Sequence, residues 1–146
     1  MSSKEIKNFL IQGTFTGKLA TVKKDGSPHV VPIWFVLDCD DHSTGDIVLT
    51  TGGTSIKAKN IQHDNRVCVS IDDQIPTFSF VVVFGTAKIY HPKHDELLKW
   101  ATKIAERYMG KENAEKYGRI NSGEGAVLVR IKPTRIIAEK DTAVLS

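Results

Sequence analysis

The feature that most limits the folds open to this chain is a β-hairpin predicted near its N-terminus. The runs Lys18–Val22 and Pro28–Leu37 are rich in β-branched and aromatic side chains, and Asp25-Gly26 lies in the turn between them. An Asp-Gly pair between two such runs is a strong hairpin signal, because it suits the positive φ angles of a tight turn. Pro32 cannot donate a ladder hydrogen bond, so the second strand should be irregular or edge-like at that point.

The rest of the chain continues the β-rich pattern. Further strands are predicted over Asp46–Thr51, Asn65–Asp72, Phe78–Tyr90, Ala126–Ile131 and Arg135–Glu139. Helices are predicted over Ser3–Gln12, Ser55–Gln62, Lys93–Met109 and Glu112–Tyr117. Gly85 suggests a bulge within its long strand. Six or seven strands with few helices predict a mainly β fold, an antiparallel barrel with helices packed outside, because closing the sheet removes exposed edges.

Composition narrows the class of protein. The chain has 146 residues, 40% of them hydrophobic, which predicts one domain over residues 1–146 with a real core. A net charge of +3 permits anionic small molecules but is far from a nucleic-acid-binding composition. The N-terminus lacks a secretory pattern, and no apolar run approaches the ~20 residues that span a bilayer. Cys39 and Cys68 lack CxxC spacing, so we expect reduced thiols in a cytoplasmic protein without membrane contact.

A second feature, Leu49–Asn60 (LTTGGTSIKAKN), predicts an anion site. A β-rich run ends in threonines and glycines, and a helical segment begins at about Ser55 with Lys57 in its first turn. The N–H groups at a helix start, the hydroxyls and the lysine together suit an anion such as a cofactor phosphate. Lys57 and Lys59 do not share a helix face, so one can face a buried anion while the other faces solvent. Spacing alone leaves it equally open that both are solvated surface lysines.

Other catalytic patterns are missing from the sequence. The five histidines form no HxH or HExxH pattern, so we expect no metal site. The carboxylates show no spacing typical of acid/base pairs, and Walker and Rossmann glycine patterns are lacking. On strand periodicity, one of Trp34 and Phe35 faces inward and the other outward. The run Phe78–Phe84 is apolar on both faces, which predicts burial in a barrel or at a subunit interface.

Three segments, read in order, carry a resemblance to a known family. They are GKLATVKKDGSPHVVPIWFV, IVLTTGGTSIKAKNIQHDNRVCVSID and FSFVVVFGTAKI. Over about residues 15–140 the chain resembles the split-barrel flavin and deazaflavin oxidoreductases, the relatives of pyridoxamine 5'-phosphate oxidase. The similarity is strongest to the subgroup that uses coenzyme F420, a deazaflavin.

The resemblance implies a set of cofactor-binding residues. The ring system of the cofactor would be bordered by Val31, Pro32, Ile33 and Trp34. The ribityl chain would contact Leu49, Thr50 and Thr51, and the phosphate would bind Ser55, Lys57 and Asn60. The anionic tail of coenzyme F420 would have Lys18, Lys23, Lys24 and Lys59 as surface partners.

The resemblance also implies a function and a partner. It implies an oxidoreductase that transfers hydride from reduced coenzyme F420 to a small-molecule substrate with an activated double bond, working as a homodimer with cofactor sites at the interface. Ile56 stands where the oxidase has an arginine before the lysine, and Phe80 stands near its glutamine, which argues against pyridoxamine-phosphate oxidation. FMN in place of coenzyme F420, or a non-catalytic flavin- or tetrapyrrole-binding protein, remain the alternatives. No catalytic residue is predicted, because the cofactor performs the chemistry.

Overall fold

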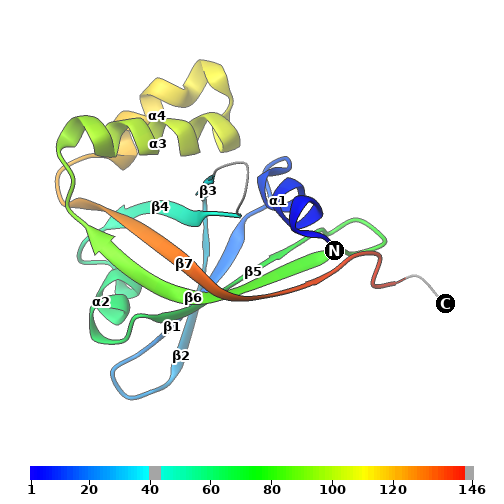
Figure 1. Cartoon of the computed structure of the whole chain (residues 1–146). Helices are drawn as coiled ribbons and strands as arrows, with labels where there is room; N and C mark the ends of the chain where they lie inside the picture. Colours follow the sequence, from blue (N-terminus) through cyan, green and yellow to red (C-terminus); the bar gives the residue numbers. More distant parts are fainter. Residues whose placement is uncertain (40–43, 144–146) are drawn as a thin grey trace.

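The computed structural model describes residues 1–39 and 44–143, and seven strands within them form one antiparallel sheet (Figure 1). The strands are β1 (Gly17–Val22), β2 (Pro28–Ile33), β3 (Val36–Asp38), β4 (Asp46–Gly52), β5 (Arg66–Asp72), β6 (Phe80–Tyr90) and β7 (Ala126–Glu139). Their order in the sheet is β2-β1-β5-β6-β7-β4-β3. The predicted mainly β fold with flanking helices is confirmed.

The sheet is closed by a two-residue step in the chain. β2 and β3 lie at opposite ends of the strand order, yet only Trp34 and Phe35 separate them in sequence. The two sheet edges must therefore come close together, and the sheet curls into a barrel that is split between β2 and β3. The single strand predicted over Pro28–Leu37 is wrong, because it breaks at this step. Pro32 lies on an edge strand, as predicted.

The last strand also differs from the prediction. β7 runs unbroken from Ala126 to Glu139, where two strands separated by Lys132-Pro133-Thr134 were expected. Pro133 lies opposite Gly85, next to the register shift between Phe84 and Gly85. The proline, which has no N–H to donate, therefore falls where the ladder is already irregular, and the strand can continue through it. The bulge predicted at Gly85 is confirmed.

Helices close and cover the barrel. They are α1 (Ser3–Ile11), α2 (Ile56–His63), α3 (His94–Met109) and α4 (Ala114–Asn121), with a 3-10 turn at Lys111–Asn113. A capping box between Ser2 and Glu5 starts α1, which buries Phe9 and Leu10 in the barrel core. Outside the barrel, Trp100 and Leu97 of α3 pack on β4 and β7. No helix in residues 1–39 and 44–143 is both long and apolar enough to cross a membrane.

The bulge at Gly85 generates a stability prediction. A Cβ at Gly85 would lie 2.5 Å from the carbonyl oxygen of Lys132, which is backbone and cannot rotate away. We expect Gly85→Ala to lower the free energy of unfolding by about 1–3 kcal/mol, as overpacking does elsewhere. Gly52→Ala is the matched control, since its Cβ would meet no atom within 4 Å. Urea unfolding of both variants checks this, and equal midpoints would contradict the close approach.

Candidate functional site

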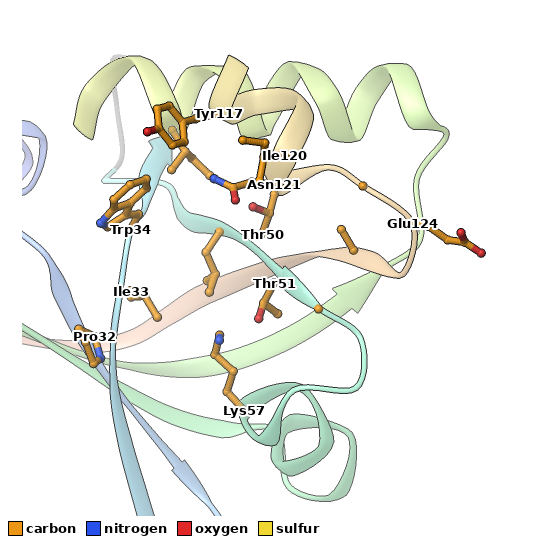
Figure 2. Close-up of a pocket in the computed structure, with 15 residues that line it drawn as sticks. Pro32, Ile33, Trp34, Thr50, Thr51, Lys57, Tyr117, Ile120, Asn121 and Glu124 are labelled. Carbon is orange, nitrogen blue, oxygen red and sulfur yellow. The ribbon is translucent and has the colours of Figure 1, made fainter. Parts of the chain in front are cut away.

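A cleft of about 650 Å³ lies between the β2–β3 step, β4, α2 and α4 (Figure 2). The structure brings most of the predicted cofactor residues to it. Those that line it are Pro32, Ile33, Trp34, Leu49, Thr50, Thr51 and Lys57. The strand-loop-helix segment and the second strand, which are separate motifs in the sequence, thus meet at one cavity.

Lys57 supplies the positive charge of the cleft. It lies in the first turn of α2, and its side chain points from that helix into the cavity (Figure 2). No carboxylate of the described residues forms an ion pair with its ammonium group. Burial therefore lowers the pKa of Lys57, because it removes water from the ammonium group and nothing replaces that water. A partly desolvated cation without a partner is suited to an incoming anion.

Three predicted residues lie outside the lining of the cleft. Val31 is partly buried and packs against the barrel core. Ser55 caps α2, with its Oγ accepting from Ala58 N at 3.2 Å and from Thr51 Oγ1 at 3.2 Å. Asn60 is 8% exposed and donates from Nδ2 to Thr21 Oγ1 at 3.0 Å. Ser55 and Asn60 therefore use these side-chain groups in hydrogen bonds within the protein, and neither residue lines the cleft.

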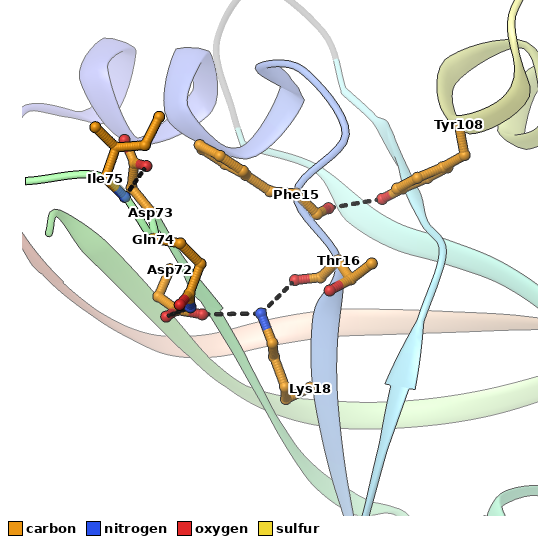
Figure 3. Close-up of polar contacts among 8 residues, drawn as sticks. All are labelled: Phe15, Thr16, Lys18, Asp72, Asp73, Gln74, Ile75 and Tyr108. Atoms are coloured by element: carbon orange, nitrogen blue, oxygen red, sulfur yellow. Dashed lines mark hydrogen bonds and ion pairs between the residues drawn. The ribbon is translucent and has the colours of Figure 1, made fainter.

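Trp34 forms the aromatic wall of the cleft, and Tyr108 of α3 holds it there. The two rings stack at 5.1 Å between centroids and 6° between planes. The Tyr108 hydroxyl accepts from Phe35 N at 3.2 Å and donates to Phe15 O at 2.8 Å, a contact drawn in Figure 3. Burial raises the pKa of Tyr108, so the hydroxyl keeps its proton. As predicted for this pair, Phe35 faces inward, fully buried, and Trp34 is 37% exposed.

Arg107 secures the same step from the neighbouring position on α3. Its guanidinium donates to the carbonyl oxygens of Phe35 at 2.8 Å, Leu10 at 2.7 Å and Gly13 at 3.0 Å. These carbonyls come from the β2–β3 step and from the end of α1. Since the guanidinium of Arg107 joins these two segments to α3, the chain beside Trp34 is held by backbone hydrogen bonds as well as by ring stacking.

Sequence reasoning missed the opposite wall, which α4 and the following turn provide. The additional lining residues include Tyr117, Ile120, Asn121 and Glu124. The helix predicted over Glu112–Tyr117 in fact continues to Asn121, which places Ile120 and Asn121 on the cleft. The available signal was the spacing of Tyr117, Ile120 and Asn121, which share one helix face.

Lys18, which we expected to contact the anionic tail of coenzyme F420, instead forms an ion pair with Asp72. Its ammonium lies 2.8 Å from Asp72 Oδ1 and 3.2 Å from the carbonyl oxygen of Thr16, and Gln74 Nε2 donates to the other oxygen of Asp72 (Figure 3). This group lines a different depression from the cleft. Within residues 1–39 and 44–143, no cluster of three His, Cys, Asp or Glu side chains could hold a metal ion.

Comparison with known proteins gives a family match over nearly the whole chain. The sequence profile of the pyridoxamine 5'-phosphate oxidase family matches residues 2–139. A Streptomyces rimosus subsp. rimosus protein named 5a,11a-dehydrotetracycline/5a,11a-dehydrooxytetracycline reductase is 36% identical over 92 residues. That match covers 60% of this chain and 62% of the reductase, so it spans less than two thirds of that protein's length.

Solved structures share the fold. A conserved hypothetical protein from Mycobacterium tuberculosis, Rv2991, is 30% identical with a TM-score of 0.80, covering 98% of this chain and 87% of that one. A structure described as an F420 reductase is 24% identical with a TM-score of 0.70, covering 89% and 94% of the two chains. The latter likeness concerns the fold.

The two hydrogen bonds of the Tyr108 hydroxyl generate a second prediction. Tyr108→Phe keeps the ring on Trp34 but removes the hydroxyl that joins Phe35 and Phe15, so we expect a loss of about 1–3 kcal/mol in unfolding free energy from the unsatisfied backbone groups. Tyr117→Phe is the control, because no described residue is hydrogen-bonded to the Tyr117 hydroxyl. Thermal or urea unfolding measures both. An unchanged unfolding free energy in Tyr108→Phe would show that these hydrogen bonds do not stabilise the β2–β3 step.

Proposed function

Because the chain belongs to the pyridoxamine 5'-phosphate oxidase family, we propose that it is an oxidoreductase that uses reduced coenzyme F420 to reduce an activated double bond in a small-molecule substrate. The observation that carries the proposal is Lys57, a half-buried cation without an acidic partner at one end of a cleft that also has an apolar and aromatic wall. A site of this kind suits a ligand with a flat ring at one end and a phosphate at the other.

The residues of the cleft fit the parts of the coenzyme. Pro32, Ile33 and Trp34 offer an apolar and aromatic wall for the ring system. Thr50 and Thr51 of β4 offer backbone and hydroxyl groups for the ribityl chain, and Lys57 offers its charge for the phosphate. Ile56, which replaces the arginine of the oxidase, is 57% exposed, so Lys57 is the cation on which phosphate binding depends.

The protein's part in the reaction is to bind, orient and shield. When bound, the reduced coenzyme would supply a hydride to one end of the substrate's double bond and be oxidised, and the other end would take a proton from solvent or a nearby hydroxyl. The apolar wall keeps water from the ring face. Among the described cleft residues, Lys57 and Glu124 are the charged ones, and they do not form an acid/base pair.

Two relatives support this reading. The Streptomyces rimosus protein is named as a reductase of dehydrotetracyclines, and the similar solved structure is described as an F420 reductase. Neither relative decides between coenzyme F420 and FMN, since the proposed phosphate contact would serve both.

Removal of the charge at Lys57 tests the proposal. We expect Lys57→Met to weaken coenzyme F420 binding by roughly 10- to 100-fold, the range for losing one charge-assisted hydrogen bond, in a titration that follows coenzyme fluorescence. Parallel titration with FMN identifies the preferred cofactor. Lys4→Met is the matched control, because Lys4 is an exposed lysine of α1 that does not line the cleft. Equal affinities for Lys57→Met and Lys4→Met would overturn the phosphate assignment.

Lys57→Met should also change the stability of the ligand-free protein, and the charge of Lys57 should make coenzyme binding depend on pH. Since burial lowers the pKa of Lys57 in the folded protein, its charged form is disfavoured by folding, and this penalty applies below the lowered pKa. Lys57→Met should therefore raise the stability of the ligand-free protein at neutral pH. Coenzyme binding by the wild type should weaken as pH rises through the pKa of Lys57 in the complex.

We further propose a homodimer with the cofactor clefts at its interface. Val81 and Val83 of β6 are fully buried, whereas Phe84 on the outer face is 37% exposed, and Ile137 of β7, the register partner of Val82, is 38% exposed. Register partners of Phe84 continue this outer face through Cys68 of β5 and Ala20 of β1 to Val30 of β2, which is 61% exposed and lies two residues before Pro32 of the cleft. A partner covering this apolar face would therefore border the cleft as well.

A charge placed in the apolar face tests the dimer. We expect the wild type to sediment as a dimer and Phe84→Glu to shift it to monomer, because a desolvated carboxylate is costly at an apolar interface. Lys88→Glu, four residues further along the same strand face, changes the charge where a lysine already lies and is the control. Analytical ultracentrifugation measures both, and a monomeric wild type would refute the dimer.

A further inference from the structure

One helix face is directed at the cleft from the side opposite Lys57. Tyr117, Ile120 and Asn121 of α4 line the cavity at one end, and Lys57 lies at the other, with Thr50 and Thr51 between them (Figure 2). Ile120 is 59% exposed although its helix is packed on its other side. A large apolar side chain left in water at the mouth of a cavity is suited to covering a ligand.

The opposite face of α4 fixes the position of this wall. Gly118 is buried against α3, where a Cβ would lie 2.3 Å from Thr102 Oγ1 and 2.9 Å from Thr102 Cα. Ala114 is buried on the same side, and Ser122 Oγ donates to the carbonyl oxygen of Gly118 at 2.7 Å. The wall is thus held by α3, while Lys57 is held by α2, so the two ends of the cleft are positioned by separate elements.

The chemistry of the α4 wall differs from that of the Lys57 end. Its polar groups are the Tyr117 hydroxyl and the Asn121 amide, and neither is hydrogen-bonded through its side chain to any residue in the described part of the chain. Lys57 is the one cation among the described lining residues, and Glu124 lies at the rim near the α4 end. The ammonium of Lys116, which is not a lining residue, lies 5.6 Å from the centroid of the Tyr117 ring. This end therefore favours an uncharged ligand with a hydrogen-bonding edge over an anion.

We infer that α4 recognises the substrate and selects an uncharged ring compound that carries a carbonyl or hydroxyl group. Ile120 and the Tyr117 ring cover the face of the substrate ring, and the Asn121 amide binds its polar group. This rests on the proposed function, because it takes the Lys57 end of the cleft for the coenzyme. The competing assignment, in which α4 binds the anionic coenzyme tail, is an outcome of the test below.

The test uses a matched pair of ring probes and the protein loaded with oxidised coenzyme F420. The probes are 2-methoxy-1,4-naphthoquinone, which is neutral, and 2-hydroxy-1,4-naphthoquinone, which is an anion at neutral pH. Calorimetric titration should show the neutral probe binding roughly 10-fold or more tightly than the anion. Ile120→Ser and Asn121→Leu should each weaken the neutral probe by roughly 10-fold and leave coenzyme affinity within about twofold.

The control variant changes a residue of α4 that does not line the cleft. Arg119→Ala removes an exposed side chain of α4 that pairs with Glu115, so it should change neither affinity. Weaker coenzyme binding in the Ile120 and Asn121 variants with an unchanged probe would assign α4 to the coenzyme tail and overturn the inference. A wild type that binds neither probe, or prefers the anion, would also overturn it. If Lys57→Met instead left coenzyme affinity unchanged while the α4 variants lost the probe, the coenzyme placement would fail and the α4 assignment would stand.

Discussion

The step at Trp34 and Phe35 is the constraint on which the barrel and the cleft both depend. It joins the two ends of the sheet order with only two residues, so it fixes how far the barrel can open. A break in strand pairing leaves backbone groups without ladder partners, and here the N–H and C=O of Phe35 are satisfied by Tyr108 and Arg107. Tyr108 also stacks on Trp34, which lines the cleft. Barrel closure and the aromatic wall therefore have one physical cause.

The two ends of the cleft are carried by different helices, α2 and α4. α2 carries Lys57 and is anchored by its Ser55 cap and by the buried contact between Asn60 and Thr21. α4 is anchored on α3 through Gly118. Such an arrangement allows one end of a cavity to keep a fixed ligand while the other end varies, which is how a common fold can serve different substrates.

Local patterns in the sequence were sufficient to predict much of the fold. The Asp-Gly hairpin and the strand, loop and helix over Leu49–Asn60 depend on neighbouring residues, and both could be predicted. The bulge at Gly85 involves the distant Lys132, but a glycine within a strand was enough to predict it. The break at Phe35 could not, because its hydrogen-bond partner Tyr108 lies 73 residues away. The family resemblance implies that Asn60 binds the phosphate, yet its Nδ2 donates to Thr21, 39 residues earlier. The α4 wall depends on the close approach of Gly118 to Thr102, which no local pattern encodes.

Lys57 shows why such a site is kept despite its effect on stability. A lysine half-removed from water without a carboxylate partner disfavours the folded state of the empty protein. An internal carboxylate would remove that penalty, but it would also compete with a phosphate for the same ammonium group. The uncompensated charge is the property on which the proposed binding of an anion at this end of the cleft depends.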